Sequence, residues 1–364
     1  MKNICLYLHV HQPLRLTRLN YLEIGTVNDY FHGSSPFSNE EIIAKVANKS
    51  YLPTNRLLLK LLRQHPEFRL SLSITGVFIE QLQKYDPGVL KSFQELVETG
   101  RVEIVAETYH HSLASIYSVS EFAEQIMIHM NLVNSVFEVK PRIFRNTELI
   151  YNDYIASLVK EMGFEAILAE GWDKYLEWRS PNFLYEANTE ELSEGVKQTL
   201  ARYNFSKGSN SKSLKLLLKN YKLSDDIAFR FSNQAWEDHP LSVEKYCKWV
   251  EDSPGETINL FMDYETFGEH QWEDTGIFKF LKNLPKAVFK KSKFKFAAPS
   301  EVAEKLQPVA AVNVPHPVSW ADEERDLTAW LGNDLQNDAF NKLYSLMDKV
   351  NRCNDKKILA YSNF

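Results

Sequence analysis

Cysteine is scarce in this sequence, and its three copies form no recognisable motif. Cys5, Cys247 and Cys353 are far apart, odd in number, and in no Cys-x-x-Cys or Cys/His spacing. Such a pattern argues against a disulfide framework and against a structural zinc site. It favours a reducing compartment, where free thiols persist.

An excess of positive charge and long apolar runs are also lacking. The 364 residues carry a formal net charge of −6, so there is no basic field for a nucleic acid, and none is expected as a partner. Two lysine clusters, within 212–222 and 290–295, indicate solvated surface. No apolar run approaches the roughly 20 residues of a membrane span, and the N-terminus leads into a strand pattern without a signal region. We therefore expect a cytoplasmic protein without membrane association; its oligomeric state stays open.

Motifs for nucleotide binding and acyl transfer are missing. No Gly-x-Gly-x-x-Gly or P-loop follows a predicted strand, and no Gly-x-Ser-x-Gly elbow occurs. The sequence therefore predicts no cofactor and no serine nucleophile of that kind.

Strand and helix patterns alternate along most of the chain in units of roughly 30 residues, which favours βαβ units and a parallel sheet. About seven strands fit, which suits a barrel better than an open sheet. The strand patterns lie at 4–10, 68–74, 102–106, 143–145, 166–169, 257–262 and 294–297. The helix patterns lie at 53–63, 77–83, 88–98, 118–137, 153–162 and 275–290.

Two regions break this alternation. Residues 173–220 carry short β-like pieces at 183–186 and 199–203 and a polar loop at 207–211, and we interpret them as an insertion near the site. From about residue 299 the pattern is helical, notably at 333–350. We therefore expect a catalytic barrel over residues 1–298, with the insertion around 173–220, and a helical region over 299–364 packed on the barrel.

The end of the strand at 257–262 is the strongest chemical signal. Asp263 is the first ionisable residue after this apolar run, and Glu265 and His270 follow it. Functional groups of barrels lie where strands end, and apolar neighbours would raise the pKa of Asp263 toward that of a general acid. The alternative is an acidic turn that only caps the strand.

Two histidines end the first strand. His9 and His11 alternate along it, so both face the same side. A His-x-His pair after a first barrel strand is also how amidohydrolases hold divalent metal. Later strands end in Glu170 and Asp263 instead of further histidines, so we expect no metal and keep a metal-dependent hydrolase as the least favoured alternative.

Acids and an arginine mark two further strands. Glu103 and Glu107 lie on the same face of the strand pattern that begins at residue 102. Glu103 suits a buried partner of a histidine, and Glu107 lies nearer the mouth of the predicted barrel. Glu148 follows the strand at 143–145, and the guanidinium of Arg145 would keep its carboxylate ionised. Glu148 kept ionised and Asp263 kept protonated would form the unequal carboxylate pair that glycoside hydrolysis requires.

Aromatic residues are abundant, with 17 Tyr, 22 Phe and 7 Trp. Flat rings suit stacking on sugar faces, although most of them belong in a core of this size. Trp320 and Trp330 bracket an acidic run that includes Asp326, and Trp172 follows a strand end. These residues predict a stacking platform with hydroxyl acceptors, or alternatively an acidic run that caps a helix.

Five of these segments together resemble, in order, the five signature regions of family 57 of the glycoside hydrolases, in its short α-amylase-like subgroup. Together they extend over most of the chain. The segments are His9–Pro13, Gly100–Val105, Phe144–Glu148, Asp263–Gly268 and Trp320–Trp330.

The resemblance implies a (β/α)₇ barrel with a helical C-terminal part and a retaining mechanism on α-1,4-glucans without a catalytic metal. By position in the motifs, Glu148 matches the nucleophile and Asp263 the general acid/base. The matching substrate-binding residues are His9, His11, Glu103, Glu265 and Asp326. To these we add further candidates for substrate contact, namely Glu107, Arg145, Trp172, His270 and Trp320.

The resemblance leaves several alternatives to hydrolysis. One is a 4-α-glucanotransferase on the same scaffold, and another is a glucan-binding relative that has lost catalytic geometry. An α-glucan or malto-oligosaccharide is the expected substrate in the enzymatic cases.

Overall fold

The computed structural model describes residues 1–27, 29–205, 213–291 and 293–353, and its strands form two five-stranded sheets. In the first sheet the order is β3-β2-β1-β8, β9 also pairs with β1, and every pairing is parallel. The central strand β1 is buried at every position but its first, as expected for a strand covered on both faces. The strands are β1 (Lys2–Val10), β2 (Leu70–Ile74), β3 (Val102–Ile104), β8 (Thr257–Asp263) and β9 (Phe294–Phe296).

The second sheet has the order β10-β6-β7-β5-β4, and only the β6–β7 pairing is antiparallel. Its strands are β4 (Ile143–Arg145), β5 (Ala166–Glu170), β6 (Tyr185–Ala187), β7 (Lys215–Lys219) and β10 (Ala311–Val312). The two sheets meet at a parallel bridge between Ala106 and Phe144, and Asn259 Nδ2 of β8 donates to the Leu218 carbonyl of β7 at 2.8 Å. The parallel α/β class is confirmed. The strands of the described residues form no closed barrel, so the seven-stranded barrel stays a prediction.

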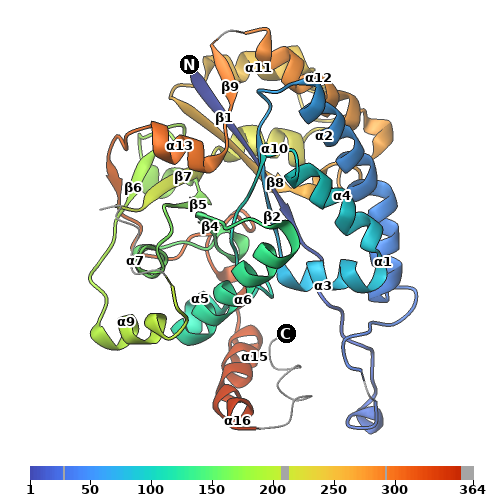
Figure 1. Cartoon of the computed structure of the whole chain (residues 1–364), viewed down its shortest axis with the longest axis vertical. Helices are drawn as coiled ribbons and strands as arrows, with labels where there is room; N and C mark the ends of the chain where they lie inside the picture. Colours follow the sequence, from blue (N-terminus) through green and yellow to red (C-terminus); the bar gives the residue numbers. More distant parts are fainter. Residues whose placement is uncertain (28, 206–212, 292, 354–364) are drawn as a thin grey trace.

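Helices pack around the two sheets, and α1, α2 and α4 line one side of β1 and β2 (Figure 1). The helix predicted at 118–137 is α6, and Ser118 caps it by accepting a hydrogen bond from the Glu121 backbone N–H. The helices up to residue 162 are α1 (Asn39–Val46), α2 (Leu52–Gln64), α3 (Gly76–Tyr85), α4 (Pro87–Val97), α5 (Ala114–Tyr117), α6 (Val119–Phe137) and α7 (Asp153–Glu161). Those that follow are α8 (Asp173–Leu176), α9 (Glu194–Ala201), α10 (Tyr221–Ala228), α11 (Val243–Asp252), α12 (Ile277–Phe289), α13 (Pro299–Lys305) and α14 (Thr328–Leu331).

Two details of the region predicted as an insertion differ from the structure. The prediction of a β-like piece at 199–203 was wrong, because the last turn of α9, which Ser193 caps, lies there. Strand β7, which the sequence did not reveal, lies between β6 and β5 inside the second sheet. Lys219 on this strand is only 4% exposed, so for this residue the interpretation as solvated surface was also wrong. The predicted loop at 207–211 lies outside the described residues.

The helix predicted at 333–350 is divided into α15 (Asp334–Ser345) and α16 (Met347–Asn351). No residue of α15 is buried, and Leu335 is 84% exposed. Tyr344 of α15 stacks on Tyr117 at 4.3 Å between ring centroids, and α15 projects beyond α5 and α6 (Figure 1). Close packing of residues 299–364 on the sheets therefore stays a prediction. Within the described part of the chain, no helix has the length and apolarity to cross a membrane.

Candidate active site

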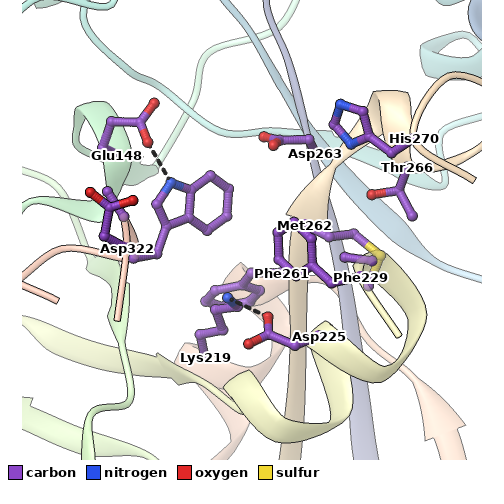
Figure 2. Close-up of a pocket in the computed structure, with 13 residues that line it drawn as sticks. Glu148, Lys219, Asp225, Phe229, Phe261, Met262, Asp263, Thr266, His270 and Asp322 are labelled. Carbon is purple, nitrogen blue, oxygen red and sulfur yellow. Dashed lines mark hydrogen bonds and ion pairs between the residues drawn. The ribbon is translucent and has the colours of Figure 1, made fainter. Parts of the chain in front are cut away.

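A cavity of about 220 Å³ lies where β8 and β4 end, and polar side chains converge on it. Four of the predicted site residues line it: Glu148, Asp263, His270 and Trp320. Figure 2 shows Glu148 and Asp322 on one side and Asp263 with His270 on the other. The other lining residues are Lys219, Asp225, Ala228, Phe229, Phe261, Met262, Thr266, Ala321 and Asp322.

Glu148 is held in an unusual backbone conformation just after β4. Its φ is 52°, and Leu149 also has a φ of 52°, in the left-handed region that non-glycine residues rarely occupy. The carbonyl of Glu148 accepts a hydrogen bond from the Trp320 backbone N–H at 3.0 Å. Strained conformations of this kind persist only where surrounding contacts enforce them, and they are frequent at functional sites.

Two side chains fix the carboxylate of Glu148. His111 Nε2 lies 2.6 Å from Oε1, and the indole Nε1–H of Trp320 donates to Oε2 at 2.8 Å. Burial alone would raise the pKa of Glu148, but the hydrogen bond from His111, the charge of Arg145 and the hydrogen bond from Trp320 together lower this pKa to about 2. Glu148 is therefore ionised at neutral pH.

Asp263 is less enclosed. Its side chain is 40% exposed, and Oδ1 lies 3.4 Å from His9 Nδ1, because His9 and Asp263 are register partners on β1 and β8. Tyr264 and Phe267, which follow Asp263 in the sequence, belong to the core.

Glu265 is the acid of this segment that burial affects most. Burial, together with the charge of Asp263, raises the pKa of Glu265 to about 8, although a hydrogen bond from the Tyr51 hydroxyl opposes the rise. Gln12 Nε2 donates to Glu265 Oε1 at 3.5 Å. Glu265 is therefore mostly protonated at neutral pH.

Three histidine rings stack beside the two acids. The His111 ring lies 4.8 Å from the His9 ring and 4.4 Å from the His11 ring, between centroids. His11 Nδ1 is hydrogen-bonded to Thr75 Oγ1 at 2.9 Å. The sequence pair His9 and His11 does face one side, as alternation predicted, but His111 from the loop after β3 was not among the predicted site residues. Its position in the segment that also contains Glu107 was the available signal.

Glu107 and Arg145 lie buried behind these histidines. Glu107 Oε2 is 3.1 Å from His9 Nε2, 3.6 Å from His111 Nδ1 and 3.3 Å from Arg145 Nη1. Burial would raise the pKa of Glu107, but the three nitrogen groups outweigh it and hold this pKa well below the usual value. Both side chains have no exposed surface, so their contacts are with other residues of the site.

The same residues answer the question of a metal site. His9, Glu107 and His111 offer three possible ligand atoms within 4.8 Å of one another, whereas His11 is not part of this group. Arg145 Nη1 lies 3.3 Å from His9 Nε2, 3.3 Å from Glu107 Oε2 and 3.4 Å from His111 Nδ1. A permanently charged nitrogen thus lies among the three atoms, which argues against a metal held by His9 and His11.

Three of the predicted residues lie outside both the cavity lining and the group of residues beside it that contains His9, His11, Glu107, Arg145 and Glu265. Glu103 Oε2 accepts a hydrogen bond from the backbone N–H of Ser300 at 3.0 Å, so it caps α13 instead of pairing with a histidine. Asp326 Oδ1 accepts from the backbone N–H of Thr328 at 2.8 Å. The Trp172 ring is covered by the ammonium of Lys174 at 4.9 Å. The structure does not bring these three residues to Glu148 and Asp263.

Sequence reasoning also missed part of the lining. Lys219 Nζ lies 3.1 Å from Asp225 Oδ1 and 5.3 Å from the centroid of a Trp320 ring. Phe229, which is 66% exposed, forms an apolar part of the wall. Asp322, rather than Asp326, is the acid of its segment in the lining. The signal for Lys219 was its place at the end of a strand, and that strand was not recognised.

Comparison with known proteins places this site in context. A "Putative alpha-amylase" of Methanocaldococcus jannaschii is 43% identical over 358 residues, which cover 98% of this chain and 71% of that protein. An "Alpha-amylase" of Pyrococcus horikoshii is 22% identical over 142 residues, covering 39% of this chain and 22% of that protein.

Two solved structures share the fold. The GH57-type branching enzyme of Pyrococcus horikoshii has a TM-score of 0.66 at 16% identity, covering 100% of this chain and 84% of that one. The 4-alpha-glucanotransferase of Thermococcus litoralis has a TM-score of 0.62 at 17% identity, covering 96% of this chain and 46% of that one. Residues 5–315 match the family described as Glycosyl hydrolase family 57. The chain therefore belongs to glycosyl hydrolase family 57 and is an enzyme of the glycoside hydrolase class.

Proposed function

We propose that this protein is a retaining glycoside hydrolase that acts on α-1,4-glucans, with Glu148 as nucleophile and Asp263 as general acid/base. The observation that carries the proposal is the contrast between two carboxyl groups lining one cavity. Glu148 is fixed by two donors and ionised, with a pKa of about 2, whereas the Asp263 side chain is 40% exposed and its Oδ1 lies 3.4 Å from His9 Nδ1. A nucleophile needs the first environment, and a group that exchanges protons with leaving group and water suits the second.

The proposed reaction has two steps. Glu148 attacks the anomeric carbon while Asp263 transfers its proton to the departing glycosidic oxygen, which gives a covalent glycosyl-enzyme. Asp263, now a carboxylate, then accepts a proton from water as the water oxygen attacks the same carbon and Glu148 departs. Two inversions leave the product with its α configuration. The hydrogen bonds from His111 and Trp320 orient the attacking carboxylate.

The size and charge of this site suit a neutral sugar. At about 220 Å³ the space is below the roughly 300–1,000 Å³ of drug-sized ligand pockets, so it suits a single sugar ring with the rest of the chain outside. Glu265, which is buried outside the lining and protonated at neutral pH, adds no negative charge beside it. The name of the 43% identical relative supports an α-glucan as the substrate.

The finer form of the fold belongs to the same proposal. Strands β1, β2, β3, β4, β5, β7 and β8 would form the distorted (β/α)₇ barrel of the family, and the Ala106–Phe144 bridge and the β7–β8 hydrogen bond support this arrangement. We also propose a cytoplasmic location, on the basis of the free cysteines Cys5, Cys247 and Cys353.

A 4-α-glucanotransferase is the second candidate. Phe229 is an exposed ring in the cavity wall on the side of Met262 and Thr266 (Figure 2), where it offers a flat face to an acceptor sugar. An acceptor hydroxyl held there would replace water in the second step. The fold shared with the Thermococcus litoralis enzyme is consistent with this activity.

Product analysis with maltoheptaose separates the two candidates. Hydrolysis yields only shorter oligomers, and proton NMR during the reaction should show the α-anomer first. Transfer yields longer oligomers as well. Glu148→Gln should abolish both activities, and Asp326→Asn, a change of the same kind at an acid outside the cavity, should keep them. Unchanged activity of Glu148→Gln would reject the proposed nucleophile.

A further inference from the structure

Both side chains that donate to Glu148 also contact one buried cation. Arg145 Nη1 lies 3.4 Å from His111 Nδ1, and the other ring nitrogen, Nε2, contacts Glu148. The guanidinium carbon lies 5.4 Å from the centroid of a Trp320 ring, whose Nε1–H donates to the other oxygen of Glu148. Arg145 therefore supports Glu148 through two neighbours, and no hydrogen bond joins Arg145 to Glu148 among the described residues.

The guanidinium of Arg145 determines which ring nitrogen of His111 carries the proton. Arginine stays protonated and can only donate, so His111 Nδ1 must be the acceptor when the two are hydrogen-bonded. His111 then carries its proton on Nε2, directed at Glu148 Oε1. A metal ion bound at Nδ1 would impose the same tautomer, because it also requires a lone pair on the nitrogen it binds.

The atoms around Arg145 Nη1 are of the kinds that bind metal cations. Its three neighbours, His9 Nε2, Glu107 Oε2 and His111 Nδ1, are a donor set that suits Zn²⁺. Among the described residues, the guanidinium makes its hydrogen bonds through this one nitrogen, while the buried Nε and Nη2 have no hydrogen-bond partner there. Arg145 thus acts here mainly as a point charge.

We propose that Arg145 takes the place of a divalent cation between His9, Glu107 and His111 and is the positioning residue that directs the Nε2–H of His111 at Glu148. The kinetic consequence rests on the proposed role of Glu148. The cation exchange and the tautomer do not, so these can be tested even if Glu148 has another role.

Metal uptake tests the exchange. The full chain is treated with a chelator and titrated with Co²⁺, followed by visible absorption, and with Zn²⁺, followed by calorimetry. Arg145→Ala should bind one equivalent of either ion, and Arg145→Ala/His111→Ala should bind none. The wild type and Arg142→Ala should show no uptake that depends on His111; Arg142 pairs with Glu165 outside the site. Uptake of one equivalent by the wild type that disappears in His111→Ala would overturn the proposal, as would a folded Arg145→Ala that binds neither ion.

Removing one partner of a buried ion pair can prevent folding. The second measurement is therefore made on the wild type and does not require Arg145→Ala to fold. Nitrogen NMR of wild type labelled with ¹⁵N-histidine should show His111 with a proton on Nε2 and none on Nδ1, its signals assigned by their loss in His111→Asn. Arg145→Lys keeps a single charged nitrogen and should preserve this tautomer, with kcat reduced about tenfold or more and KM changed less. A proton on Nδ1 in the wild type would overturn the proposal. Activity of Glu148→Gln with the expected tautomer would instead reject only the proposed function.

Discussion

The two sides of the cavity differ in how firmly they hold their carboxyl group. On the Glu148 side, His111 and Trp320 each contact one carboxylate oxygen, and the backbone is held in a left-handed conformation. On the Asp263 side, the side chain is 40% exposed and Oδ1 lies 3.4 Å from His9 Nδ1. Positioning and charge are built into the first side, whereas access to solvent is kept at the second. This difference is what a fixed nucleophile and a proton-exchanging acid/base require.

Breaking the Glu148 side should have the largest effect. Glu148→Ala should lower kcat/KM by more than about 10⁴-fold, because the covalent step is lost. Sodium azide should then restore turnover of an α-glucosyl fluoride by direct attack, with fluoride leaving, to give the β-glucosyl azide. Proton NMR of the product identifies the anomer. An α-azide from this variant would mean that Glu148 is not the nucleophile.

Breaking the Asp263 side should cost less and depend on the leaving group. Asp263→Ala should lower activity on maltoheptaose by about 10²–10⁴-fold, because leaving-group protonation is lost. Fluoride needs little protonation, so formation of the glycosyl-enzyme from the α-glucosyl fluoride should be much less affected. Azide should give the α-glucosyl azide from this variant, since it then attacks the glycosyl-enzyme. Equal losses on both substrates would contradict the acid/base role.

Weakening the support of Glu148 should change the pH dependence of activity. His111→Asn removes a hydrogen bond that helps to lower the Glu148 pKa to about 2, so this pKa should rise toward 4.5. The acid limb of kcat/KM should then move to higher pH, as measured on an α-glucosyl fluoride. A depressed carboxyl pKa stabilises the fold above 4.5, and this stabilisation is lost as the pH falls toward 2. Thermal unfolding of the variant should therefore depend less on pH in this window. An unmoved acid limb would argue against the role of His111.

Glu265 should give the smallest effect, and one of opposite sign. Its folded-state pKa is about 8 against an ordinary value of 4.5, so between these pH values the unfolded chain releases a proton that the folded chain keeps. Its contribution therefore becomes less favourable as the pH rises from 4.5 to 8. Glu265→Gln should raise the melting temperature by a degree or two at pH 8 and by less at pH 5, measured by calorimetry. The same shift at both pH values would exclude this titration.

Sequence patterns predicted the parts of the molecule that local periodicity controls. Strand β4 has the predicted bounds, β1 and β8 differ from theirs by one or two residues, and α6 begins one residue after its predicted start. Strand β7 was missed because lysines flank its three leucines. Lys219 pairs with Glu170, which is distant in the sequence, and with Asp225, which lies in a helix that was not predicted. Local charge indicated surface where tertiary pairing allowed burial.

The same limit applies to the site. Motif order identified Glu148 and Asp263, which line one cavity. It could not show that Arg145 supports Glu148 through His111 and Trp320, because this arrangement joins side chains that lie far apart in the sequence. Nor could it separate Asp322, which lines the cavity, from Asp326, which bonds the backbone of Thr328.

Trapping of the glycosyl-enzyme tests the central claim most directly. The full chain is incubated with 5-fluoro-α-glucosyl fluoride, which should form the intermediate faster than it is hydrolysed, and then digested and analysed by mass spectrometry. The account predicts one 5-fluoroglucosyl group per chain, located on Glu148 and absent from Glu148→Gln. A label on another carboxyl, such as Asp263 or Asp322, would contradict it.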